Sequence, residues 1–150
     1  MTLPSLARLL LALCLAGSVV PAAAVIDGVA TVKSLKGDVR IQRGGRELPV
    51  AVGTALLQED TIVTGSDGSA GLTFADNTLI SLGARSRFVI DRFRFDRTSN
   101  GGEFQSTLSK GRMAVVSGKI AKSQIDAMKV RTPTSLLGVR GTEFVVEAGR

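Results

Sequence analysis

The chain has 150 residues, a formal net charge of +6 and 44% hydrophobic residues, which is the size and composition of one globular domain. It contains no histidine, tryptophan or tyrosine and a single cysteine, Cys14. The lack of histidine excludes a Ser-His-Asp triad and a histidine-ligated zinc site.

The first two dozen residues have the layout of an export signal. Arg8 supplies positive charge, an apolar run follows, a proline ends it, and small residues lead up to Ala24. We therefore predict cleavage between Ala24 and Val25, which gives a signal peptide of residues 1–24 and a domain of residues 25–150. The apolar run is shorter than the roughly 20 residues of a membrane-spanning helix. A signal anchor that stays attached is the alternative interpretation.

Cys14 lies inside the apolar core of this leader and is expected to leave with it. The domain then has no thiolate for catalysis or metal binding and no disulfide, so its core alone must stabilise it. An exported domain without disulfides fits a bacterial periplasm, or secretion by a bacterium. No stable membrane span is expected after cleavage.

Apolar and polar residues alternate in four segments, at residues 38–42, 69–74, 128–131 and 143–147. A period of two with one apolar face indicates half-buried strands. Glycine-rich turn signals, among them Lys110-Gly111, recur at intervals of about 8–12 residues, as in all-β domains. We predict an all-β fold of many short strands, in a β-helix or solenoid-like or a sandwich-like arrangement, after an N-terminal signal helix.

Two segments stand outside this alternation. Residues 98–102 are expected to form a hairpin loop, and residues 120–127 either a single helical turn or a loose loop.

One segment changes phase. Phe88 and Ile90 occupy even positions, whereas Phe93 and Phe95 occupy odd ones. A regular strand cannot bury all four side chains on one face. We therefore predict a bulge or corner at Asp91-Arg92 that resets the register, unless both faces are covered there.

Few residues could carry chemistry. A Ser–Lys pair and a carboxylate pair remain open, but there is no Ser-x-x-Lys helix start, and the Trp and Tyr on which sugar-cleaving clefts commonly stack sugars are absent. We predict no enzymatic activity and no cofactor. Four turn residues could bind calcium, although Asx turns are favoured: Asp60, Asp67, Asp76 and Asn77.

The densest basic run comprises Arg85, Arg87, Arg92, Arg94 and Arg97. Acidic residues interrupt it, and stacking aromatics are missing, so no nucleic-acid interface is expected. It is interpreted as a solvated strand face or as a contact for an anionic envelope component or an acidic partner.

An ordered set of motifs carries a resemblance to a known family: KGDV at 36–39, DTIVTG at 60–65, SAGLTFADNT at 69–78, LSKGR at 108–112 and VRTPTSLLGVRGTEF at 130–144. The set resembles the FecR domain over about residues 37–146. This resemblance implies the periplasmic part of iron-citrate-type regulators, which receives a signal from an outer-membrane transporter and passes it to a cytoplasmic sigma factor. It also implies a β-helix- or solenoid-like fold.

Unlike those regulators, this sequence starts with a predicted cleavable signal, so sigma-factor control by this chain alone is not expected. We predict an exported, non-catalytic binding or sensing module that contacts another cell-envelope protein. The alternative is a structural or surface-associated protein that binds peptidoglycan or another anionic envelope glycan. An open sheet edge near the end of the chain would invite pairing with a partner or with a second copy.

The signature stretch, residues 131–146, provides the candidate site residues, which are Thr132, Pro133, Gly138, Arg140, Gly141, Thr142 and Phe144. We interpret it mainly as a fold element. The residue before Pro133 is extended, the glycines permit sharp bends or close backbone approach, and Thr142, Phe144 and Val146 turn one strand face to the core.

Arg140 is the one candidate for a functional contact in this stretch. It either ties down a carboxylate inside the domain, such as Glu143 or Asp76, or points outward to a partner. The internal role is the favoured one.

Overall fold

A computed structural model describes residues 27–149, so the predicted signal helix and the predicted cleavage site at Ala24 and Val25 lie outside the described residues. The first eight strands are β1 (Ala30–Lys36), β2 (Val39–Arg43), β3 (Arg46–Leu48), β4 (Ala55–Leu56), β5 (Thr61–Thr64), β6 (Ser69–Phe74), β7 (Leu79–Leu82) and β8 (Arg87–Phe95). They are followed by β9 (Gly102–Val116), the helix α1 (Lys119–Ser123), β10 (Met128–Arg131), β11 (Leu136–Val139) and β12 (Glu143–Ala148).

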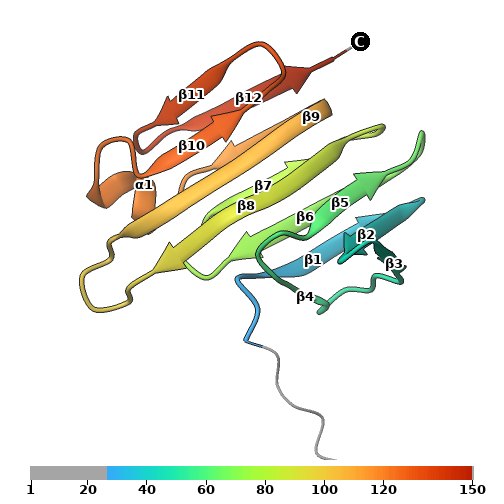
Figure 1. The fold of residues 1–150 in the computed structure, drawn as a ribbon, viewed down its shortest axis with the longest axis horizontal. Helices are drawn as coiled ribbons and strands as arrows, with labels where there is room; N and C mark the ends of the chain where they lie inside the picture. The colour runs from blue at the N-terminus through green and yellow to red at the C-terminus, as the bar shows by residue number, and fades with distance from the viewer. Residues whose placement is uncertain (1–26, 150) are drawn as a thin grey trace, which may run out of the picture.

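The strands form one open, curled sheet whose two halves share β9 (Figure 1). One half has the order β4-β1-β6-β7-β9-β12, and the other has the order β3-β2-β5-β8-β9-β10-β11. Within the described residues, all strand pairs are antiparallel except β9 and β10. The all-β prediction is confirmed. The β-helix- or solenoid-like arrangement that the resemblance implied is wrong, because the strands pair almost entirely antiparallel in one curled sheet, and the sandwich-like alternative describes its two facing halves.

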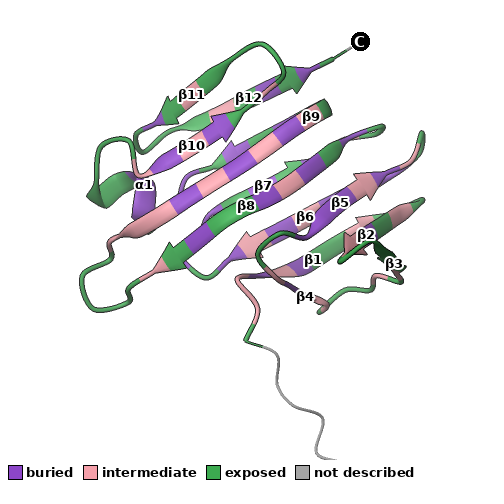
Figure 2. Ribbon diagram, viewed as in Figure 1, coloured by how far each residue is buried: buried purple, intermediate pink, exposed green. Residues whose placement is uncertain are grey.

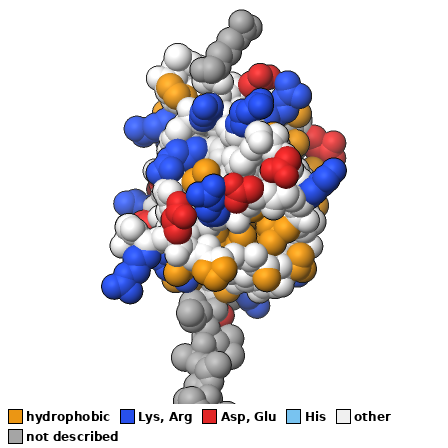
Figure 3. All heavy atoms as spheres, turned by 90° about the vertical axis from the view of Figure 1, so that its right-hand side faces the viewer, with side chains coloured by type: hydrophobic (Ala, Val, Ile, Leu, Met, Phe, Trp, Pro, Cys, Tyr) orange, Lys and Arg blue, Asp and Glu red, His pale blue; other side chains and the backbone are white. Residues whose placement is uncertain are grey.

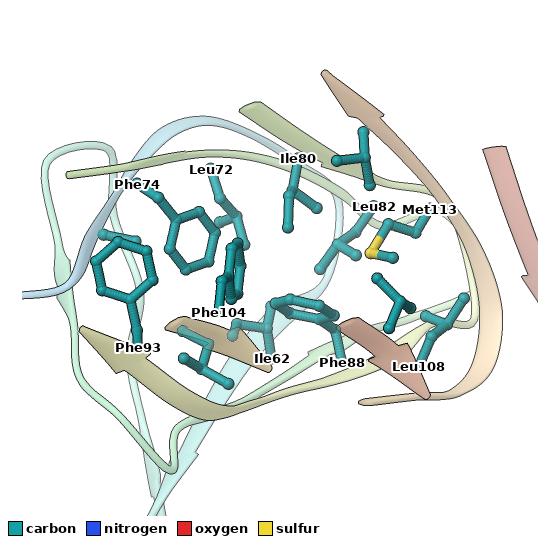
Figure 4. Close-up of a cluster of buried hydrophobic side chains, with 14 of the residues drawn as sticks. Ile62, Leu72, Phe74, Ile80, Leu82, Phe88, Phe93, Phe104, Leu108 and Met113 are labelled. Atoms are coloured by element: carbon teal, nitrogen blue, oxygen red, sulfur yellow. The ribbon is translucent and has the colours of Figure 1, made fainter. Parts of the chain in front are cut away.

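Each half turns one face inward. Buried residues alternate with partly or fully exposed ones along the strands, as in β6, where Ala70, Leu72 and Phe74 are buried (Figure 2). Side chains from the two halves meet in the core, where the ring of Phe74 lies 5.4 Å from that of Phe93 and 4.5 Å from that of Phe104 (Figure 4). Such aromatic pairs add about 0.5–1.5 kcal/mol each beyond the burial of their area.

The predicted bulge in β8 is confirmed. The pairing of β8 with β9 shifts between Ile90, opposite Ser106, and Arg92, opposite Gln105, so Asp91 is the extra residue. The shift lets Phe88, Ile90 and Phe93 all lie buried on one face.

β9 is the longest strand, with 15 residues, and it passes from one half of the sheet to the other near Gly111. Gly111 has φ +95°, and a Cβ there would lie 2.4 Å from the Cα of Ser86. A side chain would therefore be both strained and obstructed. The turn predicted at Lys110-Gly111 is a bend inside one strand, because β9 is paired with antiparallel neighbours both before and after Gly111.

The loop at residues 98–102 joins β8 to β9 as a hairpin, as predicted. Residues 119–123 form the single helical turn that was one of two expectations for that region. Within residues 27–149 no helix is long and apolar enough to span a membrane.

Candidate functional site

The signature stretch builds the last hairpin of one sheet half and the corner that leads into the other. Its first part is the turn between β10 and β11. The backbone N–H of Thr132 donates to the carbonyl of Ser135 (2.8 Å), and the hydroxyl of Thr132 accepts from the N–H of Ser135 (3.0 Å). Pro133 is exposed in this turn. Thr132 and Pro133 therefore shape a turn by local hydrogen bonding.

The two glycines of the stretch have different roles. Gly138 is not at a bend, since it lies within β11 opposite Lys129. A Cβ at Gly138 would lie 2.9 Å from Oδ1 of Asp126, the end of a flexible side chain, so the expected close backbone approach is not found there either. Gly141 has φ +57° and turns the chain between β11 and β12.

Thr142 fixes this corner to the end of β9. Its N–H donates to Oγ of Ser117 (2.9 Å), and its carbonyl accepts from the N–H (3.2 Å) and the hydroxyl of Ser117. The prediction that Thr142 faces the core is wrong, because the residue is exposed and its backbone makes these contacts. Phe144 is half-buried and Val146 is buried, as expected for the closing strand.

Arg140 lies at the corner, and its side chain is exposed. Within residues 27–149 its side chain makes no ion pair or hydrogen bond, and the two expected partners, Glu143 and Asp76, are therefore not its partners. The favoured internal role is therefore not what the structure shows. The Asp76 carboxylate is instead satisfied by Thr78, whose N–H and hydroxyl donate to it at 3.0 and 2.8 Å.

Beside this corner, the outer faces of β7, β9 and β12 carry an exposed apolar patch formed by Leu79, Ala114, Val116 and Val145. Leu79, Val116 and Val145 are 46%, 40% and 65% exposed. Leu79 lies opposite Val116, and Ala114 lies opposite Val145, so the side chains adjoin across three neighbouring strands. A groove of about 350 Å³ runs over them.

The sequence analysis missed this patch, although a signal for it exists. Leu79-Ile80, Val115-Val116 and Val145-Val146 are doublets of adjacent apolar residues. Because successive strand residues face opposite sides, each doublet must place one apolar residue outward. Only the register shows that the three outward residues are neighbours.

β12 gives the patch a polar border. Among the described strands it pairs with β9 alone, so its other edge is open. Glu143 and Glu147 flank Val145 on its outer face, and Glu147 accepts from Nη2 of Arg112 at 2.9 Å. Such an edge offers backbone donors and acceptors to an incoming strand.

The turn residues considered as calcium ligands have other tasks. Asp76 forms an Asx turn with Thr78, as expected. Asp60 does not, because its carboxylate pairs with Arg43 and accepts from the N–H of Leu57. In the described part of the chain, no three acidic, histidine or cysteine side chains come together as metal ligands would.

The basic run does not form a single surface. Arg92 and Arg94 both approach Oε2 of Glu103, at 3.5 and 3.7 Å. Arg87 instead donates to Oε1 of Gln42 (3.0 Å). The middle of the run is therefore a solvated strand face, whereas Arg85 and Arg87 lie at one end of the molecule.

Ser106 of β9 and Lys129 of the neighbouring strand β10 do not form a Ser–Lys pair. The hydroxyl of Ser106 is buried without a hydrogen-bond partner in the described residues. Lys129 lies opposite Gln105, whereas Ser106 lies opposite buried Val130. Serine and lysine therefore project from opposite faces of the sheet.

Comparison with curated proteins and with solved structures gives no significant match. Comparison with protein families matches residues 60–150, more than half of the chain, to the family described as FecR protein. The match contains β5 to β12, and with them the apolar patch and the signature corner. FecR domains are regulatory signalling domains that are typically periplasmic. The chain therefore belongs to the FecR family.

Proposed function

We propose that this domain is an exported, non-catalytic sensing module that contacts another protein of the cell envelope. The observation that carries the proposal is the apolar patch on β7, β9 and β12. Family membership supports a sensing role, and the patch supplies a surface on which a partner could act.

The patch has the properties of a protein contact. Val145, on the outermost strand of the patch, is 65% exposed and lies next to the open edge of β12. Contiguous exposed apolar side chains rimmed by polar ones mark interaction sites, and an open edge allows a partner to add a strand. Backbone pairing along β12 and apolar contact over Val116 and Leu79 would then act together.

A second copy of this chain fits the edge less well. An antiparallel pairing of two β12 strands centred on Val145 would set Glu143 of each copy opposite Glu147 of the other. Like charges directly opposite each other destabilise a strand pair. We therefore assign the surface to a different protein.

The experiment is photo-crosslinking and capture from envelope extracts, with Val145→Glu as the test variant. Val52→Glu is the matched control, because Val52 is 64% exposed in a loop outside the patch. We expect a crosslinker placed at Ser81, beside the patch, to join one envelope protein. Wild type and the control should capture it, whereas Val145→Glu should lose it.

Equal crosslinking by Val145→Glu and wild type, or no specific crosslink at all, would refute the assignment. Sedimentation with purified cell wall tests the glycan alternative in parallel. Salt-sensitive sedimentation that Val145→Glu leaves unchanged would favour glycan binding.

A further inference from the structure

Two turns at one end of the sandwich bring four basic side chains together. A groove of about 440 Å³ is lined by Arg85, Lys110 and Arg112. A second groove, of about 350 Å³, is lined by Arg85, Arg87 and Lys110. The turn between β7 and β8 and the bend of β9 lie at the right-hand end in Figure 1, and Figure 3 views this end directly, with Lys and Arg side chains among its surface groups.

Hydrogen bonds hold the two turns in a fixed relation. Oγ of Ser86, a buried residue, accepts from the N–H of Arg112 (3.1 Å) and donates to the carbonyl of Gly83 (2.8 Å). The N–H of Gly83 donates to the carbonyl of Arg112 (2.9 Å). The backbone that carries the basic side chains is therefore preorganised.

Arg85 occupies a strained position. Its φ is +54°, a conformation that favours glycine and costs other residues about 1–2 kcal/mol. Its N–H donates to the carbonyl of Gly65 (2.9 Å), which glycine would do equally well. Its side chain is exposed and makes no ion pair within residues 27–149. Strained positions of this kind cluster at functional sites.

Among the residues that line the two grooves, basic side chains outnumber acidic ones. Glu147 is the one acidic residue that lines either groove, and it is paired with Arg112 at 2.9 Å. Lys110, like Arg85, has no ion-pair partner among the described residues. Lys110 and Arg87 are direct cross-strand neighbours, and like charges so placed repel. A bound anion would remove this repulsion.

We propose that Arg85 and Lys110 form a binding site for a phosphate group, with Arg87 and Arg112 adding positive charge around it. A guanidinium offers a planar fork of donors and an ammonium a compact charge, a pair suited to an ion with several equivalent oxygens. The phosphate belongs either to a soluble phosphorylated compound or to the head group of an anionic phospholipid. The site adjoins the apolar patch, since Arg112 lies two residues from Ala114 on the outer face of β9 and Glu147 borders both surfaces.

The test is a titration of the protein with inorganic phosphate at constant ionic strength, followed by backbone amide chemical shifts. We expect saturable shifts at Arg85, Lys110 and their neighbours. The variant Arg85→Gly should weaken binding about tenfold or more, the effect of losing one charge-assisted hydrogen bond. Because glycine suits a positive φ, this variant should melt no lower than wild type, and its loss of binding cannot be attributed to unfolding.

Lys110→Gln should weaken binding as well, whereas Arg97→Gln, in the loop after β8, serves as a control of equal charge change and should not. A second arm measures co-sedimentation with vesicles of phosphatidylglycerol in phosphatidylcholine, against phosphatidylcholine alone. Sedimentation that depends on Arg85 assigns the head group as ligand, and saturable phosphate binding without sedimentation assigns a soluble compound. Linear shifts with no sedimentation, or equal responses of wild type and Arg85→Gly, overturn the proposal.

Discussion

The guanidinium of Arg43 donates two hydrogen bonds to the fully buried carboxylate of Asp60. Nε donates to Oδ1 at 2.7 Å, and Nη2 donates to Oδ2 at 2.6 Å. Nη2 also donates to the carbonyl of Ala55 (3.1 Å). The hydrogen bond with Asp60 raises the pKa of Arg43, so the guanidinium stays charged. It ties the end of β2 to the residue that precedes β5.

Removing the arginine should leave a buried charge without its counterion. We expect Arg43→Met to lower the free energy of unfolding by about 3–5 kcal/mol, measured by urea denaturation. Arg46→Met, on an exposed position of β3, is the control and should change it by less than about 0.5 kcal/mol. Similar losses for both variants would contradict the importance of the pair.

The bend of β9 should tolerate no side chain. Gly111→Ala introduces a Cβ against Ser86 as well as an unfavourable backbone, whereas Gly44, with φ +55°, has nothing within 4 Å of the equivalent Cβ. We expect Gly44→Ala to cost about 1–2 kcal/mol and Gly111→Ala about 1–3 kcal/mol more, as judged from thermal unfolding. Equal costs would mean that the contact with Ser86 relaxes freely.

Because Asp91 is the extra residue of the bulge in β8, its deletion should disturb the fold little. Without it, Ile90 and Arg92 become consecutive residues opposite Ser106 and Gln105, and the ladder becomes regular. Deletion of Val89 should instead turn Ile90 outward and Asp91 inward. We expect a cooperative unfolding transition and native near-ultraviolet circular dichroism for the first deletion, and their loss for the second. The reverse result would refute this register.

Arg140 should contribute little to stability. Because its side chain is exposed and unpaired in the described structure, Arg140→Ala should change the free energy of unfolding by less than about 0.5 kcal/mol. A decrease of more than about 2 kcal/mol in the free energy of unfolding, measured by chemical denaturation, would instead support the internal role of Arg140. Ser117, the partner of Thr142, provides the contrast. It is 3% exposed, and Ser117→Ala should lower the free energy of unfolding by about 1–3 kcal/mol.

Local patterns in the sequence were sufficient for some of the strands. The alternation of Ala70, Leu72 and Phe74 predicted β6 and its inward face, and the phase change after Ile90 predicted the bulge. Both inferences depend on residues close together in the chain, where the geometry of a strand leaves few choices.

Relations between distant segments could not be predicted in this way. No pattern in the sequence links Arg43 to Asp60, or shows that the outward residues of three apolar doublets adjoin. Gly138 was expected at a sharp bend or a close backbone approach because glycine favours both, and only the pairing of β11 with β10 shows that it lies inside a strand. The direction of Arg140 was misjudged for the same reason, since a guanidinium makes good contacts on either side of a corner.

The sharing of β9 by both sheet halves has a consequence for how the chain acquires its structure. β9 begins at Gly102, so β1 to β8 leave the ribosome before the strand that joins the two halves. Until then, the edges of β7 and β8 are open and can pair with other chains. With pairings as distant as Ala30 and Phe74, such a topology folds slowly, in milliseconds to seconds. The pairing of β9 with β7 and β8 closes both edges at once, and a delay in this pairing would lead to aggregation.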